Sequence, residues 1–213
     1  PEKPDVLQEE IESANQLLEP IRQMLGIEKK NDVPQIDTAV FDEQIQIVLK
    51  YEVPVCSFTF GIPQREIIDK LNNNGIITIG TATTVKEAIM NEAAGMNMIV
   101  VQGSEAGGHR GSFAESFDHS MIGTMALIPQ VADQVSIPII AAGGITDGRG
   151  VLASLVLGAK AVQMGTAFVT CKESGANELH KKAILNATEE QAVITRAFSG
   201  KPARGLNNAF IKK

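Results

Sequence analysis

The sequence predicts an α/β fold built around a parallel sheet, and three observations lead to this prediction. Short apolar runs alternate along the chain with segments whose apolar spacing is typical of helices. The apolar runs are continuous, as expected of strands that are covered on both faces. Predicted helices end at Gly75, Gly95 and Gly158, and a new apolar run follows each of them. Strands connected by helices in this way pair in parallel through right-handed crossovers.

The first fifty residues predict two helices. Apolar residues recur at steps of three and four from Leu7 to Leu25, which places them on one helical face. Pro20 would kink or divide this helix, and Gly26 is a plausible stop. A second helix is predicted over 41–49.

From residue 53 onward, strands and helices are predicted in alternation. The predicted strands are 53–60, 76–79, 98–101, 137–142 and 162–164, and the first of them is expected to be buried. The predicted helices lie near 67–74, 84–94, 126–135, 148–157 and 178–185. Thr84 and Glu87 form a T-x-x-E capping box, and Pro129 is placed in a first helical turn. A short strand is predicted at 193–195, and 199–208 is predicted to be a loop.

We therefore expect a single domain over residues 1–213 with three parts. These are a helical N-terminal segment (1–50), the β/α units (51–170), and a C-terminal helix and loop (171–213). A net charge of −6 without basic blocks argues against a nucleic-acid partner, and no segment approaches the roughly 20 apolar residues of a membrane span. Two distant cysteines, Cys56 and Cys171, favour reduced thiols and a cytoplasmic location.

Three glycine-rich turns follow predicted strands, at 102–111, 143–150 and 163–166. In α/β proteins of this type, ligands bind at the carboxyl ends of the strands, so the three turns should converge at one edge of the sheet. Glycine lets the backbone approach a ligand closely, and backbone N–H groups bind anions. The last two turns therefore suggest a phosphate site. The alternative is that each turn only connects a strand to a helix.

His109 is the candidate for proton transfer, because it lies in one of these turns with glycines on both sides. His119 and His180 lie elsewhere and are assigned structural roles. No metal site is expected, since the histidines and cysteines lack ligand spacing.

Polar residues also stand at the strand ends. Gln102 and Gln163 could hydrogen-bond a flat polar ring, or could be ordinary polar residues at the rim of the sheet. Arg110 is expected to pair with Glu105 at the surface rather than to bind an anion.

The segment Gln102 to Phe113, QGSEAGGHRGSF, resembles the signature of the nitronate monooxygenase family. The runs 53–63, 137–168 and 197–208 are similar to the same family, in the same order. The resemblance implies an FMN-dependent (β/α)₈ TIM-type barrel. It also implies an enzyme that oxidises alkyl nitronates with dioxygen to carbonyl compounds and nitrite.

The resemblance also implies roles for particular residues. Gly143, Gly144, Gln163, Met164, Gly165 and Thr166 would hold the flavin phosphate. Gln102 and Gly107 would face the flavin, and His109 would be the catalytic base or would orient the substrate.

Two alternatives to the nitronate reaction follow from the same residues. A flavin-dependent enoyl-acyl-carrier-protein reductase shares the AAGGI-DGRG, QMGT and GGH segments, although Arg110 after the histidine favours the nitronate side. The match begins at the fourth strand of the family, which implies a partial barrel of strands four to eight that cannot close. The chain would then be a fragment or a truncated fold. The second alternative is therefore a non-catalytic piece that binds flavin or phosphate. An open sheet would also favour association into a homo-oligomer.

Overall fold

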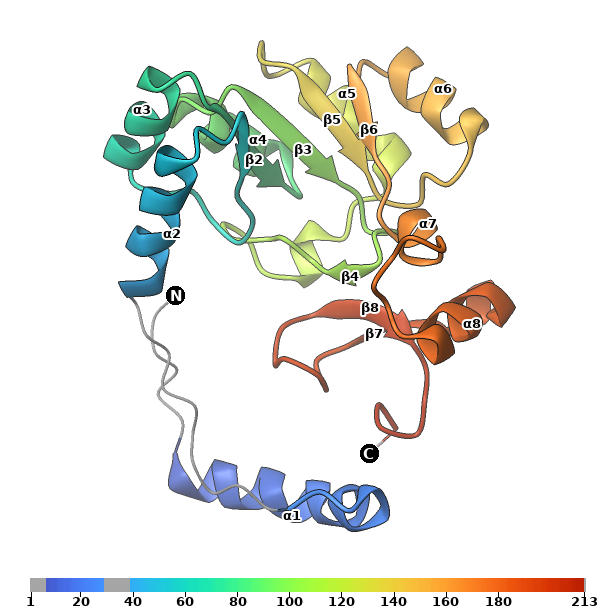
Figure 1. The fold of residues 1–213 in the computed structure, drawn as a ribbon. Helices are drawn as coiled ribbons and strands as arrows, with labels where there is room; N and C mark the ends of the chain where they lie inside the picture. Colours follow the sequence, from blue (N-terminus) through green and yellow to red (C-terminus); the bar gives the residue numbers. More distant parts are fainter. Residues whose placement is uncertain (1–6, 29–38, 213) are drawn as a thin grey trace. The chain divides into compact units, whose positions relative to one another are not determined.

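The computed structural model describes residues 7–28 and 39–212 (Figure 1). The chain divides into two compact units, one within residues 1–50 and the other over 51–212. The first contains helices α1 (Gln8–Leu25) and α2 (Ala39–Lys50). Helix α1 continues through Pro20 without a break and ends at Gly26 in the left-handed region, at φ 64°. The predicted stop is confirmed. Of the two effects predicted for Pro20, a kink or a division of the helix, the division does not occur.

A parallel sheet of five strands forms the centre of the second unit, in the order β1-β2-β3-β5-β6 (Figure 1). The strands are β1 (Val55–Ser57), β2 (Ile77–Ala82), β3 (Met98–Gln102), β5 (Ile139–Ala142) and β6 (Ala161–Gln163). Each strand pairs in parallel with the next in this order. This arrangement confirms the predicted α/β fold and its partial barrel.

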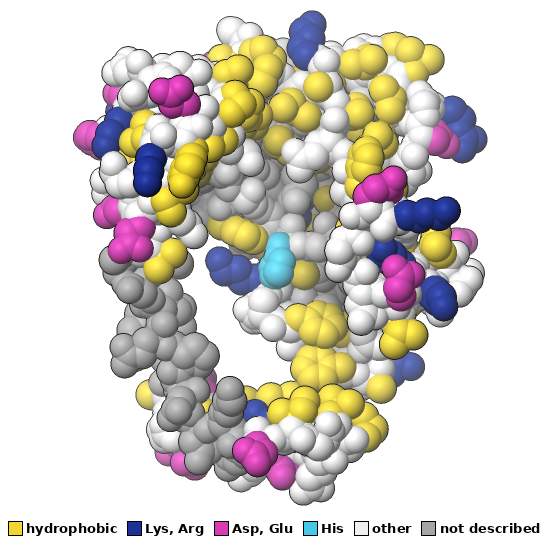
Figure 2. Space-filling view, in the orientation of Figure 1, with side chains coloured by type: hydrophobic (Ala, Val, Ile, Leu, Met, Phe, Trp, Pro, Cys, Tyr) yellow, Lys and Arg dark blue, Asp and Glu magenta, His cyan; other side chains and the backbone are white. Residues whose placement is uncertain are grey.

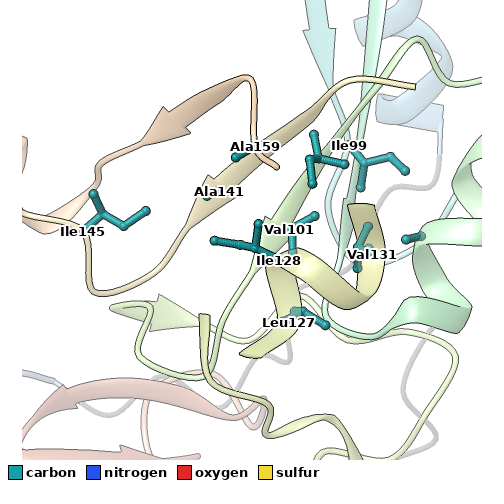
Figure 3. Close-up of a cluster of buried hydrophobic side chains, with 11 residues drawn as sticks. Ile99, Val101, Leu127, Ile128, Val131, Ala141, Ile145 and Ala159 are labelled. Atoms are coloured by element: carbon teal, nitrogen blue, oxygen red, sulfur yellow. The ribbon is translucent and has the colours of Figure 1, made fainter. Parts of the chain in front are cut away.

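Helices connect successive strands of the sheet. They are α3 (Arg65–Asn73), α4 (Val85–Ala93), α5 (Thr124–Ala132) and α6 (Gly148–Val156). Asp147 caps the N-terminus of α6, its side chain accepting from the backbone N–H groups of Arg149 and Gly150. The main hydrophobic core lies between the sheet and these helices, and Figure 3 shows Leu127, Ile128 and Val131 of α5 against Ile99, Val101 and Ala141 of the strands.

A second, antiparallel sheet has the order β4-β8-β7. It comprises β4 (Gly108–His109), β7 (Ala192–Thr195) and β8 (Ala203–Leu206). Helices α7 (Thr166–Val169) and α8 (Glu178–Asn186) lie between β6 and β7 in the sequence, and Asp118–Ser120 and Glu189–Gln191 form 3₁₀ turns. Among the described residues, no helix has the length and hydropathy needed to cross a membrane.

Three sequence predictions fail in this unit for identifiable reasons. Only Val55–Ser57 of the predicted buried strand 53–60 is paired, and Val55 and Ser57 are exposed because β1 forms an edge of the sheet. Pro129 lies inside α5, because that helix already begins at Thr124. The predicted loop 199–208 contains β8, which becomes a strand only by pairing with β4 and β7.

Candidate functional site

The three glycine-rich turns meet at the carboxyl edge of the parallel sheet. A Cβ atom added to Gly103 would lie 1.8 Å from Oγ1 of Thr124, and one added to Gly143 would lie 2.9 Å from the same atom. A Cβ atom on Gly107 would lie 2.6 Å from Oγ1 of Thr166. The absence of side chains therefore lets the turns after β3, β5 and β6 approach one another, as the sequence predicted.

Glu105 links two of these turns to the start of α5. Its carboxylate accepts hydrogen bonds from the backbone N–H of Thr124, at 2.9 and 3.1 Å. The Thr124 hydroxyl lies 2.8 Å from this carboxylate and 2.8 Å from the carbonyl oxygen of Gly143. A carboxylate at a helix N-terminus satisfies an unpaired N–H and interacts favourably with the helix dipole. This contact explains why α5 begins at Thr124.

Arg110 is buried and is not the surface partner of Glu105 that the sequence predicted. Only 7% of the residue is exposed. Its guanidinium donates to the carbonyl oxygens of Gln102 (2.5 Å), Thr83 (3.3 Å) and Ser120. Three carbonyl oxygens on different segments outcompete a single exposed carboxylate, because they satisfy several donors of the guanidinium fork at once.

Burial lowers the pKa of Arg110 to about 10, while the charges of Glu87 and Glu105 oppose this shift. The side chain therefore remains cationic at neutral pH. Its Nε atom is buried and has no hydrogen-bond partner among the described residues.

Glu87 anchors the loop that follows His109. Its buried carboxylate accepts hydrogen bonds from the backbone N–H and hydroxyl of Thr83, at 2.7 and 2.6 Å. It also accepts from the backbone N–H groups of Phe113 (2.6 Å) and Ala114 (2.9 Å). The predicted capping box is therefore only half formed. The Thr84 hydroxyl accepts from the Glu87 N–H, but the carboxylate is used by the distant loop.

Gln102 holds His109 from the other side. Its Nε2 atom donates to the carbonyl oxygen of His109 at 3.1 Å, and its Oε1 atom accepts from the N–H of Gly111 at 2.8 Å. The side chain thus bridges both ends of the segment that carries the histidine. This contact fixes the loop close to the end of β3.

The side chain of His109 is exposed and contacts two residues that the sequence analysis did not single out. Its Nε2 atom lies 2.5 Å from Oγ of Ser199, and its ring packs edge-on against Phe60 with centroids 5.9 Å apart. Phe60 has φ of 69°, a region that non-glycine residues rarely adopt and that is enriched at functional sites. In the view of Figure 2, a histidine side chain is visible at the surface with Lys or Arg side chains and hydrophobic side chains near it.

The remaining predicted residues lie at the ends of β5 and β6. Gly143 and Gly144 both adopt positive φ, at 111° and 68°. Gln163 ends β6 with an exposed side chain, and Met164 packs against the hydrophobic core. Gly165 follows, and a Cβ atom there would meet nothing within 4 Å.

These turns offer backbone donors for an anion. The N–H groups of Gly144 and Gly165 donate to no acceptor within residues 7–28 and 39–212. Such donors on flexible glycine turns suit a phosphate group. In the same described part of the chain, no group of three or more His, Cys, Asp or Glu residues could hold a metal ion.

The distribution of the site residues shows what sequence reasoning missed. Phe60 and Ser199 contact the side chain of His109, and Glu87 contacts Phe113 in the loop that follows it. All three residues lie far from this loop in the sequence. Ser199 lies within the run 197–208 that resembles the family, and this resemblance was the available signal. No sequence pattern indicates the distant contacts of Glu87, because its spacing from Thr84 is already explained by a capping box within one helix.

Comparisons with known proteins identify a family for the chain. The family profile described as nitronate monooxygenase matches residues 3–213. The chain is 55% identical over 206 residues to a probable nitronate monooxygenase of Staphylococcus haemolyticus, covering 96% of this chain and 57% of that protein. It is 56% identical over 205 residues to a probable nitronate monooxygenase of Staphylococcus aureus (strain N315), covering 96% and 58%. The chain thus spans less than two thirds of these relatives.

Two solved structures are similar to this chain over nearly its whole length. A nitroalkane oxidase from Streptomyces ansochromogenes matches with a TM-score of 0.89 at 39% identity, covering 99% of this chain and 60% of that chain. FabK from Thermotoga maritima matches with a TM-score of 0.72 at 32% identity, covering 98% and 62%. The family profile extends over nearly every residue, including all three glycine-rich turns and the His109 segment. The chain therefore belongs to the nitronate monooxygenase family.

Proposed function

We propose that this chain carries the flavin-binding edge and the proton-transfer residue of an FMN-dependent nitronate monooxygenase. The observation that carries the proposal is the meeting of three glycine-rich turns beside His109, at the carboxyl edge of a parallel sheet. This edge is where α/β barrels bind phosphate-bearing cofactors. The substrates would be an alkyl nitronate and dioxygen, and the products a carbonyl compound and nitrite.

The residues present fit FMN. Gly143 and Gly144, together with the segment 163–166, would hold the phosphate. Glycine has no side chain to block a ligand, so the backbone N–H groups of these turns are accessible. Gly107 and Gln102 would lie beside the flavin ring. When bound, FMN would supply the electron transfer between the nitronate and dioxygen.

His109 would act on protons and on the position of the substrate. A histidine can accept or donate a proton near neutral pH, and this side chain is exposed at the edge where the turns meet. Gln102 fixes the backbone of His109, and Ser199 fixes its Nε2 atom. The ring of Phe60 packs against the imidazole at an interplanar angle of 84°. The contacts with Ser199 and Phe60 would limit the rotation of the imidazole and so pre-organise it for proton transfer.

The test is a flavin titration of the 213-residue chain followed by an oxygen-uptake assay with ethyl nitronate. We expect the protein to bind FMN, with a perturbed flavin spectrum, and to consume oxygen only when the nitronate is present. Bound flavin without oxygen uptake would favour a non-catalytic flavin-binding piece. Rapid bleaching of the flavin by NAD(P)H, with reoxidation by a crotonyl thioester, would favour the enoyl-thioester reductase.

A further inference from the structure

A cavity lies beside the loop that follows His109, and the proposed function does not use it. Its volume is about 370 Å³, and it lies between the loop 110–117, the turn 196–202 and Phe60. All of these residues belong to the second unit of the chain. A cavity of this size is within the range of small-molecule binding sites.

Aromatic rings form the apolar part of the cavity. Phe60, Phe113 and Phe117 all line it. None of the three is buried, and Phe60 is 43% exposed. Three phenyl rings around one cavity favour a ligand with a ring of its own, because aromatic pairs gain from edge-to-face or offset contact beyond the area they bury.

Cations form the polar part. The Arg196 guanidinium lies 6.0 Å from the centroid of the Phe117 ring, and Nζ of Lys201 lies 4.4 Å from that of Phe60. Neither Arg196 nor Lys201 forms an ion pair with a carboxylate among the described residues. Arg196 donates from Nη1 to the carbonyl oxygen of Gly200 at 3.3 Å, and its other donors, like the ammonium of Lys201, are available to an anion in the cavity.

A third cation, Arg110, also lines the cavity and is more than nine-tenths buried, with its Nε atom lacking a partner in the described part of the chain. The one carboxylate of the lining, Glu115, accepts a hydrogen bond from Nζ of Lys86 at 2.6 Å. Lys86 therefore offsets the acidic charge, and Arg196 and Lys201 leave the lining with a surplus of positive charge. Such a surplus attracts anions.

The cavity adjoins the candidate active site, because the two share Phe60 and the turn 196–202, although His109 itself does not line the cavity. The ring of Phe60 lines the cavity and packs against the ring of His109. The turn that places Ser199 against His109 also places Lys201 over Phe60. A ligand that reacts at His109 would therefore extend past the ring of Phe60 to lie between Lys201 and the phenyl rings.

We propose, on the basis of the proposed function, that this cavity selects nitronates that carry an aromatic ring. The negative charge of the nitronate would lie near Lys201 and Arg196, and its ring would pack against Phe113 and Phe117. A small alkyl nitronate such as ethyl nitronate would leave most of the 370 Å³ unfilled. The cavity thus contributes binding that only the larger substrate can use.

The first test measures binding without turnover. The probe is 4-fluorobenzoate, a planar anion with two equivalent oxygens and an aromatic ring, titrated into the 213-residue chain and followed by ¹⁹F NMR. We expect binding that Lys201→Gln weakens at least fivefold, while Lys172→Gln, at an exposed lysine outside the cavity, leaves it unchanged. Equal binding of the neutral 4-fluorobenzyl alcohol, or unchanged binding by Lys201→Gln, would overturn the inference.

The second test compares the nitronates of phenylnitromethane and nitroethane with the FMN-loaded chain. We expect Phe117→Leu to lower kcat/KM at least fivefold for the aryl nitronate and to change it less than twofold for the ethyl compound. Circular dichroism would check that the variant is folded. Equal losses for both substrates would contradict the inference and leave the proposed function intact. No turnover of either nitronate by the unmodified chain would instead contradict the proposed function and, with it, this inference.

Discussion

The Nε2 atom of His109 lies 2.5 Å from Oγ of Ser199, although 90 residues separate them in the chain. The contact depends on the antiparallel sheet, in which β4 pairs with β8 so that His109 lies opposite Ala203. The hairpin of β7 and β8 therefore places a hydroxyl on the imidazole. A side chain held in this way has fewer orientations to sample.

The first prediction concerns Ser199. Ser199→Ala should lower turnover of a nitronate by roughly fivefold, because a net hydrogen bond contributes about 1 kcal/mol and that energy orients the histidine. The loss should appear in kcat with KM little changed, since the hydroxyl contacts the imidazole and not the substrate. Ser116→Ala, at another exposed serine, is the matched control. An unchanged kcat would show that Ser199 has no positioning role.

The second prediction concerns His109 itself. His109→Asn should leave FMN affinity within about twofold of the original and should reduce turnover by roughly 100-fold or more, the usual contribution of a general acid or base. A flavin titration and an oxygen-uptake assay on the same preparation separate the two effects. His119→Asn, at an exposed histidine, should change neither. Full activity of the His109 variant would remove this residue from the mechanism.

The third prediction concerns the buried carboxylate of Glu87. It accepts four hydrogen bonds from Thr83, Phe113 and Ala114, so Glu87→Gln would leave buried donors without acceptors. The free energy of unfolding should fall by about 2–4 kcal/mol, measured by urea denaturation. Glu66→Gln, at an exposed position in the first turn of α3, should cost less than about 0.5 kcal/mol. Equal effects of the two substitutions would contradict the anchoring role of Glu87.

The fourth prediction concerns Arg110. Arg110→Lys keeps the positive charge, but a single ammonium cannot reproduce the planar fork that contacts the carbonyl oxygens of Gln102, Thr83 and Ser120. We expect a loss of about 2 kcal/mol in the free energy of unfolding. The exposed Arg149→Lys serves as control and should be close to neutral. A neutral Arg110→Lys would show that charge alone suffices at this position.

The fifth prediction concerns Gly143. Its φ of 111° disfavours any side chain, and a Cβ atom would lie 2.9 Å from Oγ1 of Thr124 and 3.1 Å from the carbonyl oxygen of Gly103. Gly143→Ala should therefore destabilise the fold by about 1–3 kcal/mol and weaken FMN binding. Thermal unfolding and a flavin titration measure the two effects. Gly175→Ala, where a Cβ atom meets nothing within 4 Å, should alter neither.

Much of the parallel sheet could be predicted because its signals are local. Each helix from α3 to α6 follows a short apolar strand, and its periodicity lies within one segment of sequence. The glycine-rich turns were found in the same way, because a turn after a strand of a parallel sheet must lie at the carboxyl edge. The predicted limits of β1 are wrong, because the extent of an edge strand depends on its pairing with β2. The predicted position of Pro129 is wrong, because the start of α5 depends on the contact of Thr124 with Glu105.

The sequence by itself determined the α/β pattern, the three glycine-rich turns and the candidate histidine. Only the tertiary structure decided that Arg110 is buried, that Glu87 anchors the His109 loop, and that the predicted loop 199–208 contains a strand. The physical reason is the same in each case. A buried polar group must find hydrogen-bond partners, and here those partners come from distant segments, as when Arg204 donates to the carbonyl oxygen of Ser104, 100 residues earlier. Such pairings leave no period or spacing in the chain, so they become visible only once the sheet has brought the segments together.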